Sequence, residues 1–175
     1  MLKPDQLIVK AMGELYIQKA ETLKTQSGKE YIKFVYLTFI PNDNVGYKSI
    51  DFFEKNDFSR LVSILKSLDN PEHEAQFEKN STELNLGGII NDACLCFLHY
   101  KKSAGKIDSI KIISYLPREA IKNKELRTKL LTEASEASEA SEAENRTFIF
   151  SPSQLDYQDN DIKIYRGGHY EIQKI

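Results

Sequence analysis

The stretch that decides the fold is Glu30-Tyr31-Ile32-Lys33-Phe34-Val35-Tyr36-Leu37-Thr38-Phe39-Ile40. β-Branched and aromatic residues dominate it, which predicts a strand. Side chains alternate along a strand, so residues 32, 34, 36 and 38 share one apolar face. The opposite face is wetter at its start and carries Tyr31, Lys33, Val35, Leu37 and Phe39. We expect this wetter face to meet a ligand.

Turn signals on either side of this stretch predict a meander of three strands. Residues 13–25 form a strand-like run before it. The intervening residues 26–29 include Gly28, which can take the positive φ of a tight hairpin. After the turn-forming residues 41–44, a third strand is expected from Tyr47 to Phe53.

The period of the apolar residues changes after the third strand. Between Phe58 and Leu68 they recur at steps of three and four, which predicts one amphipathic helix behind Asn56 or Asp57 as N-cap. Pro71 follows the end of this helix, and a polar stretch continues to about residue 84. Two further strands are expected at residues 88–100 and 107–115, joined by residues 101–106.

This order predicts a mainly β protein built on a five-stranded barrel of the oligonucleotide/oligosaccharide-binding type (OB-fold), with a helix between strands 3 and 4. In such barrels strands 2 and 3 carry the binding face, and the loops joining strands 1–2 and 4–5 flank it. Both loops contain lysine and glycine here. We therefore expect the two loops to bring their lysines to the rim of one aromatic-bearing face.

A repeat of Glu, Ala and Ser at residues 133–144 divides the chain. Alanine and glutamate favour helix, but a period of three makes no apolar stripe, so a helix continuing from residues 120–131 and a coil remain alternatives. The expected organisation is a barrel domain at residues 1–130, an acidic linker at 131–145 and a small β extension at 146–175. Strands are expected at 148–150 and 162–165, with a turn at 165–170. So short an extension should dock on the body, on another copy or on a partner.

The net charge of −2 conceals an asymmetry between the two parts of the chain. Residues 1–130 carry 20 basic and 17 acidic side chains, or +3, whereas residues 131–175 carry 4 and 9, or −5. A mildly basic body favours binding of a polyanion. The acidic tail is expected either to be recognised by other proteins or to compete for that basic surface.

Several function classes lack their sequence signals. No apolar run reaches the roughly 18 residues that cross a bilayer, and no secretory signal is visible, so we expect no membrane association. Cys94 and Cys96 form no disulfide framework, which favours the cytoplasm, that of the host cell if the protein is phage-encoded. They lack a second Cys or His pair with zinc spacing, so neither a metal nor a cofactor is expected. The phosphate-binding loops of nucleotide hydrolases are missing.

Residues 20–34 resemble the "lysine, small, Ser-Gly-Lys, apolar" hairpin of phage- and plasmid-encoded single-stranded-DNA-binding proteins with this barrel. The resemblance covers about residues 8–118 and includes residues 85–89, which enter the fourth strand, and 109–117, which close the fifth. A basic barrel before an acidic tail is also similar. The chain departs from the common pattern at its end, which is Glu171-Ile172-Gln173-Lys174-Ile175 rather than an acidic tip with an aromatic residue.

The resemblance implies a single-stranded-DNA-binding protein without catalysis, acting in phage or plasmid replication or recombination. Lysines that follow phosphates and aromatics that stack on bases hold such strands. Partners implied besides DNA are replication or recombination proteins, met through the acidic linker and C-terminal segment, and further copies of the chain. The candidate binding residues are Tyr16, Lys24, Lys29, Tyr31, Lys33, Tyr47, Lys101, Lys102 and Lys106.

Two other functions compete with this prediction. The chain is alternatively a protein-binding module, such as a phage structural or counter-defence factor. A metal-dependent nuclease needs two or three carboxylates and often a lysine in one pocket. Asp51, Glu54 and Lys55 are the best such group, although carboxylates before a helix more often cap it.

Overall fold

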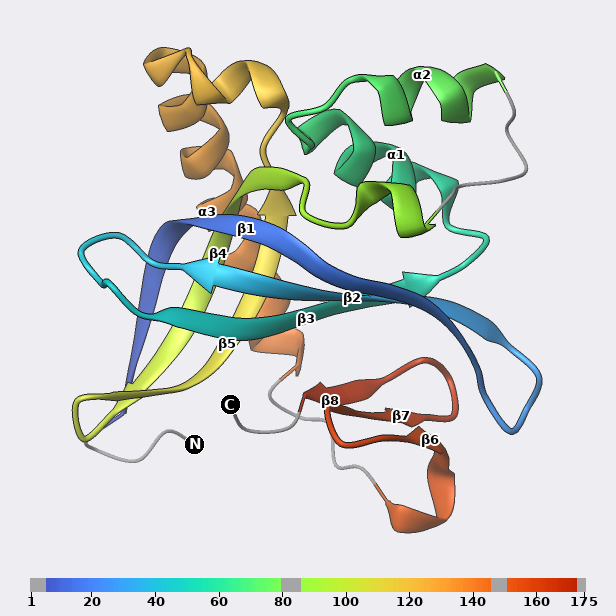
Figure 1. Ribbon diagram of the computed structural model, residues 1–175. Helices are drawn as coiled ribbons and strands as arrows, with labels where there is room; N and C mark the ends of the chain where they lie inside the picture. Colours follow the sequence, from blue (N-terminus) through green and yellow to red (C-terminus); the bar gives the residue numbers. More distant parts are fainter. Residues whose placement is uncertain (1–5, 80–85, 146–150, 173–175) are drawn as a thin grey trace.

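The computed structural model describes residues 6–79, 86–145 and 151–172, and it confirms the predicted fold class. Five antiparallel strands form a nearly closed barrel in the order β3-β2-β1-β4-β5 (Figure 1). Helices cover one end of this barrel, and a separate three-stranded sheet lies against its side (Figure 1). The chain is therefore mainly β and resembles an OB-fold.

The first three strands form the predicted meander. They are β1 (Gln6–Lys24), β2 (Glu30–Phe39) and β3 (Gly46–Glu54). The difference from the sequence prediction lies in β1, which begins at residue 6 rather than 13. Its first half, up to Tyr16, pairs with β4, and its second half, from Glu14, pairs with β2. A single long strand thus joins the two halves of the barrel.

The second hairpin consists of β4 (Ala93–Ser103) and β5 (Lys106–Tyr115). Its turn is shorter than predicted, because pairing continues to Ser103 and Lys106 and leaves only two residues between the strands. The barrel closes where β5 approaches β3. The Tyr115 hydroxyl donates to Asp51 Oδ2 over 2.6 Å, and the Arg60 guanidinium donates to the same oxygen over 2.8 Å.

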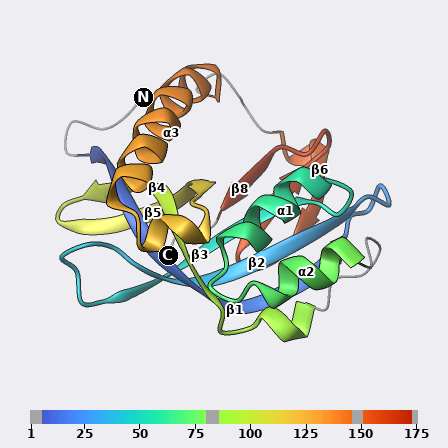
Figure 2. The ribbon, with the colours of Figure 1, turned by 90° about the horizontal axis from the view of Figure 1, so that it is seen from above.

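The predicted helix is α1 (Phe58–Ser67), and Asp57 caps it by accepting a hydrogen bond from the Arg60 amide. Its apolar face enters the barrel core. The polar stretch after it contains α2 (Glu72–Lys79). The fourth strand was expected from residue 88, but it begins at Ala93, because residues 86–89 form a 3-10 turn (Leu86–Ile89). Helix α2 lies over α1 (Figures 1 and 2).

The Glu-Ala-Ser repeat belongs to a helix, which decides between the two alternatives that the sequence left open. After a 3-10 turn (Arg118–Ile121), α3 (Lys124–Asn145) runs along the side of the barrel (Figure 2). Among the helices of the described chain, none has the length and apolar character needed to cross a membrane.

The C-terminal part forms a small antiparallel sheet, which we call the C-terminal sheet. A 3-10 turn (Pro152–Gln154) leads into β6 (Leu155–Gln158), β7 (Ile162–Tyr165) and β8 (Tyr170–Ile172), in that order across the sheet. The prediction of a strand at 162–165 with a turn after it is confirmed, whereas β6 was missed. The predicted strand at 148–150 lies outside the described residues.

Two separate clusters of buried apolar side chains hold these parts together. The larger lies inside the barrel and includes Ile32, Phe34 and Tyr36 of β2 with the apolar face of α1. The smaller contains Tyr31 and Val35, from the opposite face of β2, packed on the C-terminal sheet. The predicted alternation of β2 is therefore confirmed, and both of its faces are buried.

Candidate functional site

The outer face of β2 and β3 was expected to meet a ligand, but the C-terminal sheet covers it. We call this surface the β2–β3 face. Ile162 and Ile164 of β7 are fully buried against it. The barrel residues that they meet belong to one apolar cluster, made up of Leu23, Tyr31, Val35, Ile50 and Phe52.

Aromatic rings make up one part of this contact. The ring centroids of Tyr31 and Phe52 lie 5.1 Å apart, and the Tyr170 ring stands edge-on to Phe52 at 4.5 Å. Burial, with a contribution from the nearby Asp51 carboxylate, raises the pKa of Tyr170 to about 12. Tyr170 is therefore neutral under physiological conditions and acts here as a packing residue.

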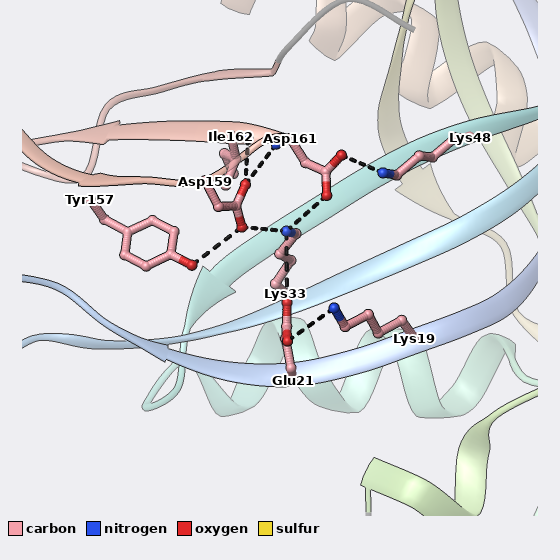
Figure 3. A network of polar contacts seen from close by, with 8 residues as sticks. All are labelled: Lys19, Glu21, Lys33, Lys48, Tyr157, Asp159, Asp161 and Ile162. Atoms are coloured by element: carbon pink, nitrogen blue, oxygen red, sulfur yellow. Dashed lines mark hydrogen bonds and ion pairs between the residues drawn. The ribbon is translucent and has the colours of Figure 1, made fainter.

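Lys33 lies at the centre of the polar part of the contact, shown in Figure 3. Only 1% of this residue is exposed. Its Nζ lies 2.6 Å from Asp159 Oδ2, 3.2 Å from Asp161 Oδ2 and 3.7 Å from Glu21 Oε1. Asp161 also pairs with Lys48 of β3, and Glu21 with Lys19. The lysine is buried with its charge compensated.

The pKa values of this group follow from that compensation. Burial alone would lower the pKa of Lys33, but the hydrogen bonds to Asp159 and Asp161 outweigh burial and raise it. Burial would raise the pKa of Asp159, whereas its hydrogen bonds with Lys33 and the backbone amides of Asp161 and Ile162 lower it overall. The ion pairs are therefore formed across the neutral pH range.

A third aspartate fixes the β1–β2 turn. Asp156 accepts hydrogen bonds from the Ser27 amide, over 2.8 Å, and from the Ser27 hydroxyl, over 2.6 Å. The Gln26 amide donates to the Asp156 carbonyl oxygen over 3.0 Å. The Ser-Gly-Lys turn at residues 27–29, on which the resemblance to single-stranded-DNA-binding proteins rests, thus binds a carboxylate of its own chain.

A second candidate surface lies at the other end of the barrel. A pocket of about 320 Å³, which we call the hairpin groove, lies between two segments of the barrel. It is lined by residues 40–43 and 47 on one side and by residues 100, 102, 105 and 107 on the other. Tyr47, Tyr100 and Lys102 line it. Tyr47 is held by a 2.8 Å hydrogen bond that its hydroxyl donates to Asp43, and both tyrosines are half-buried.

Lysines concentrate in the β4–β5 hairpin, and one of them, Lys102, lines the groove. Lys101, Lys102 and Lys106 all belong to the β4–β5 hairpin, and all three are exposed. Val45, in the β2–β3 loop beside the groove, has 56% of its surface exposed. This end of the molecule therefore combines aromatic rings with uncovered cationic side chains.

The predicted site residues fall into three separate groups, with Tyr16 apart from all of them, rather than into one site. Lys24 and Lys29 are exposed at the β1–β2 turn, where Lys29 pairs with Glu54. Tyr31 and Lys33 lie buried beneath the C-terminal sheet, which covers the face that was expected to meet a ligand. Tyr47 and Lys102 line the hairpin groove, and Lys101 and Lys106 lie in the same hairpin.

The expected cradle between the two loops is not open, because the C-terminal sheet and its aspartates cover the β2–β3 face. The β1–β2 turn follows the last residue of β1, whereas the β4–β5 turn lies beside its first residues, since Gln6 pairs with Ser103. The two turns consequently lie on opposite sides of the molecule (Figures 1 and 2). Tyr16 is apart from both, donating its hydroxyl to Glu14 and packing edge-on to Phe39.

The residues considered for a nuclease are engaged in other contacts. Asp51 is 3% exposed and accepts from Arg60 and Tyr115, as described above. Glu54 pairs with Lys29, and Lys55 pairs with Glu30. Within residues 6–79, 86–145 and 151–172, no three His, Cys, Asp or Glu side chains are grouped to hold a metal ion.

Several residues of these surfaces were missed from the sequence. Tyr100 and Phe52 were not singled out because each lies within a strand whose apolar pattern already explained it. The aspartates at 156, 159 and 161 were counted only as part of an acidic tail. Their spacing beside Ile162 and Ile164 was a usable signal of a segment that docks on a basic, apolar surface.

Two comparisons with known proteins bear on this chain. No family model matches it, and no curated protein matches it.

Proposed function

We propose that this protein binds single-stranded DNA without catalysis, in the replication or recombination of a phage or plasmid. The observation that carries the proposal is the hairpin groove, where Tyr47, Tyr100 and Lys102 line one pocket. Two further exposed lysines lie in the same hairpin. Aromatic rings beside cationic side chains are the combination that holds flexible single strands with little sequence preference.

The barrel supports the proposal, because OB-type barrels present their loops to oligonucleotides. The resemblance of residues 20–34 to single-stranded-DNA-binding proteins adds to it. The buried, unpaired thiols of Cys94 and Cys96 fit a reducing cytoplasm, with burial raising the pKa of Cys94 to about 12. The partners that we propose besides DNA are replication or recombination proteins and further copies of the chain.

The test is a titration of fluorescent oligo-dT at several salt concentrations. Binding through the groove should give a log–log salt slope of about −0.7 for each phosphate neutralised. In the triple variant K101E/K102E/K106E we expect affinity to fall at least about tenfold. Its slope should become shallower by about 2, which is about 0.7 for each of three phosphates.

A charge-matched control separates the groove from net charge. The variant K122E/K124E/K129E changes three exposed lysines that lie just before α3 and within it. It should keep the wild-type salt slope. An equal loss of affinity and of slope in both variants would contradict binding at the groove, and no binding of oligo-dT at low salt would contradict the function.

A protein-binding module is the second candidate, and one observation favours it. The β2–β3 face already buries a polypeptide segment, the chain's own C-terminal sheet, through apolar and ionic contacts. The same titration separates the two candidates, because a protein-binding module predicts no saturable binding of oligo-dT at low salt.

A further inference from the structure

The β2–β3 face carries lysine ammonium groups that could bind an anion, and aspartates of the C-terminal sheet bind them instead. We propose that this face also binds single-stranded nucleic acid, and that the C-terminal sheet keeps it closed by placing three aspartates where phosphates bind. The inference rests on the proposed function, since it extends the same ligand from the hairpin groove to a covered surface.

The positions of the carboxylates carry the inference. Asp156 accepts a hydrogen bond from the β1–β2 turn, and Asp159 forms an ion pair with Lys33 of β2. Asp161 forms ion pairs with both Lys33 and Lys48 of β3. Asp159 and Asp161 thus place negative charge against Lys33 of β2 and Lys48 of β3 (Figure 3), and Asp156 does the same at the β1–β2 turn. Backbone amides, hydroxyls and lysine ammonium groups are also the usual partners of nucleic-acid phosphates.

Aromatic rings accompany these charges, as base stacking requires. Tyr31 and Phe52 lie on the same face as Lys33, and the Tyr170 ring packs against Phe52 in a T-shaped arrangement with an interplanar angle of 90°. A nucleobase can take the place of the Tyr170 ring on Phe52. The C-terminal sheet thus supplies both a carboxylate for a phosphate and a ring for a base.

The structure of the C-terminal sheet favours its dissociation from the barrel. Three strands of three or four residues each form no independent core, and Ile162 and Ile164 are buried against the barrel instead. Release of the sheet exposes the β2–β3 face while the barrel keeps its own core. The apparent affinity of that face for a ligand is then reduced in proportion to the fraction of open molecules.

The test uses the full chain with the two central carboxylates neutralised, D159N/D161N. The control E119Q/E125Q makes the same change of net charge at two exposed residues outside the contact. We expect D159N/D161N to bind oligo-dT about tenfold more tightly than the control, as its open fraction rises. Its salt slope should steepen by about 1.4, for phosphates on Lys33 and Lys48. Adding K33Q should remove most of this gain.

The outcomes distinguish this inference from the proposed function. Equal affinities and slopes in D159N/D161N and its control, with normal wild-type binding, would overturn the covered site and leave the groove intact. Binding by D159N/D161N without wild-type binding would support the covered site and contradict the groove. Absence of binding in every variant would overturn both.

A second measurement uses the wild-type chain, so the inference does not depend on the folding of a variant. Saturating oligo-dT should speed amide hydrogen exchange in residues 155–172, because the nucleic acid displaces the C-terminal sheet. Unchanged or slower exchange in that segment, at full occupancy of the groove, would overturn the inference.

Discussion

Lys33 shows that the surroundings of a residue, more than its type, decide whether it is exposed. Lysine is almost never fully buried unless it is paired, and the alternation of β2 placed Lys33 on the wetter face. Its carboxylate partners Asp159 and Asp161 lie 126 and 128 residues later in the chain. No local pattern contains that information, so the sequence predicted the face but not its cover.

Removing the Lys33 ammonium should destabilise the protein measurably. In K33M, Asp159 and Asp161 remain partly shielded from water but no longer have a cation between them. Removing one partner of a buried ion pair costs about 3–5 kcal/mol, because the other charge stays buried without compensation. The two aspartates are about one quarter exposed, so we expect the free energy of unfolding to fall by about 2 kcal/mol. Urea denaturation measures this change.

The control for this prediction is K48M, which removes the other lysine bound to Asp161. The Lys48 side chain is 47% exposed, and such ion pairs contribute about 0–1 kcal/mol. A loss in K48M as large as that in K33M would contradict the central role of Lys33.

At the scale of elements, the sequence predicts those whose pattern is local. Strand β2 and helix α1 were predicted because their alternation and their three- and four-residue steps lie within one segment. Helix α2 carries little apolar surface beyond Phe77, and β6 is short and polar, with Asp156 buried through its contact with Ser27. Contacts with distant residues fix these two elements, which explains why both were missed.

Docking of the C-terminal sheet should depend on pH only at the extremes. Asp159 and Asp161 have pKa values below the ordinary 3.8, because their hydrogen bonds with lysines outweigh burial. Their stabilisation is present above about pH 3.8 and is lost as the pH falls through the lowered values. The raised pKa of Lys33 keeps its contribution up to at least pH 10.5.

Methyl NMR of Ile162 and Ile164 measures this docking directly. Both signals should keep their folded positions from about pH 4 to 10 and move towards unfolded positions only outside that range. Loss of docking between pH 5 and 7 would contradict the assignment of these aspartates. The D159N/D161N variant should lose most of the acid dependence.

For the whole molecule, the sequence predicted the barrel but not the direction of its loops. Strand order follows from the sequence of elements, and the five strands were found in the expected order. The positions of the loops depend instead on where β2 and β4 pair along β1, a strand whose first half was missed. With β1 running from Gln6 to Lys24, the two lysine-bearing turns become its opposite ends. The sequence could therefore name Tyr47 and Lys102 of the hairpin groove, but it could neither add Tyr100 nor separate the groove from the β1–β2 turn.

The barrel and the C-terminal sheet should behave as separable parts of the molecule. In I162D/I164D, two carboxylates replace side chains that are fully buried between them, so the C-terminal sheet should undock. The barrel core is a different cluster, and the strand signal in far-UV circular dichroism should persist.

The uncovered apolar residues of the β2–β3 face should bind a hydrophobic dye and promote self-association, detected by light scattering. The control V45D/I121D places the same charges at exposed sites and should do neither. Loss of the barrel signal together with the sheet would instead make residues 6–172 one cooperative unit, and the covered face could then open only by global unfolding.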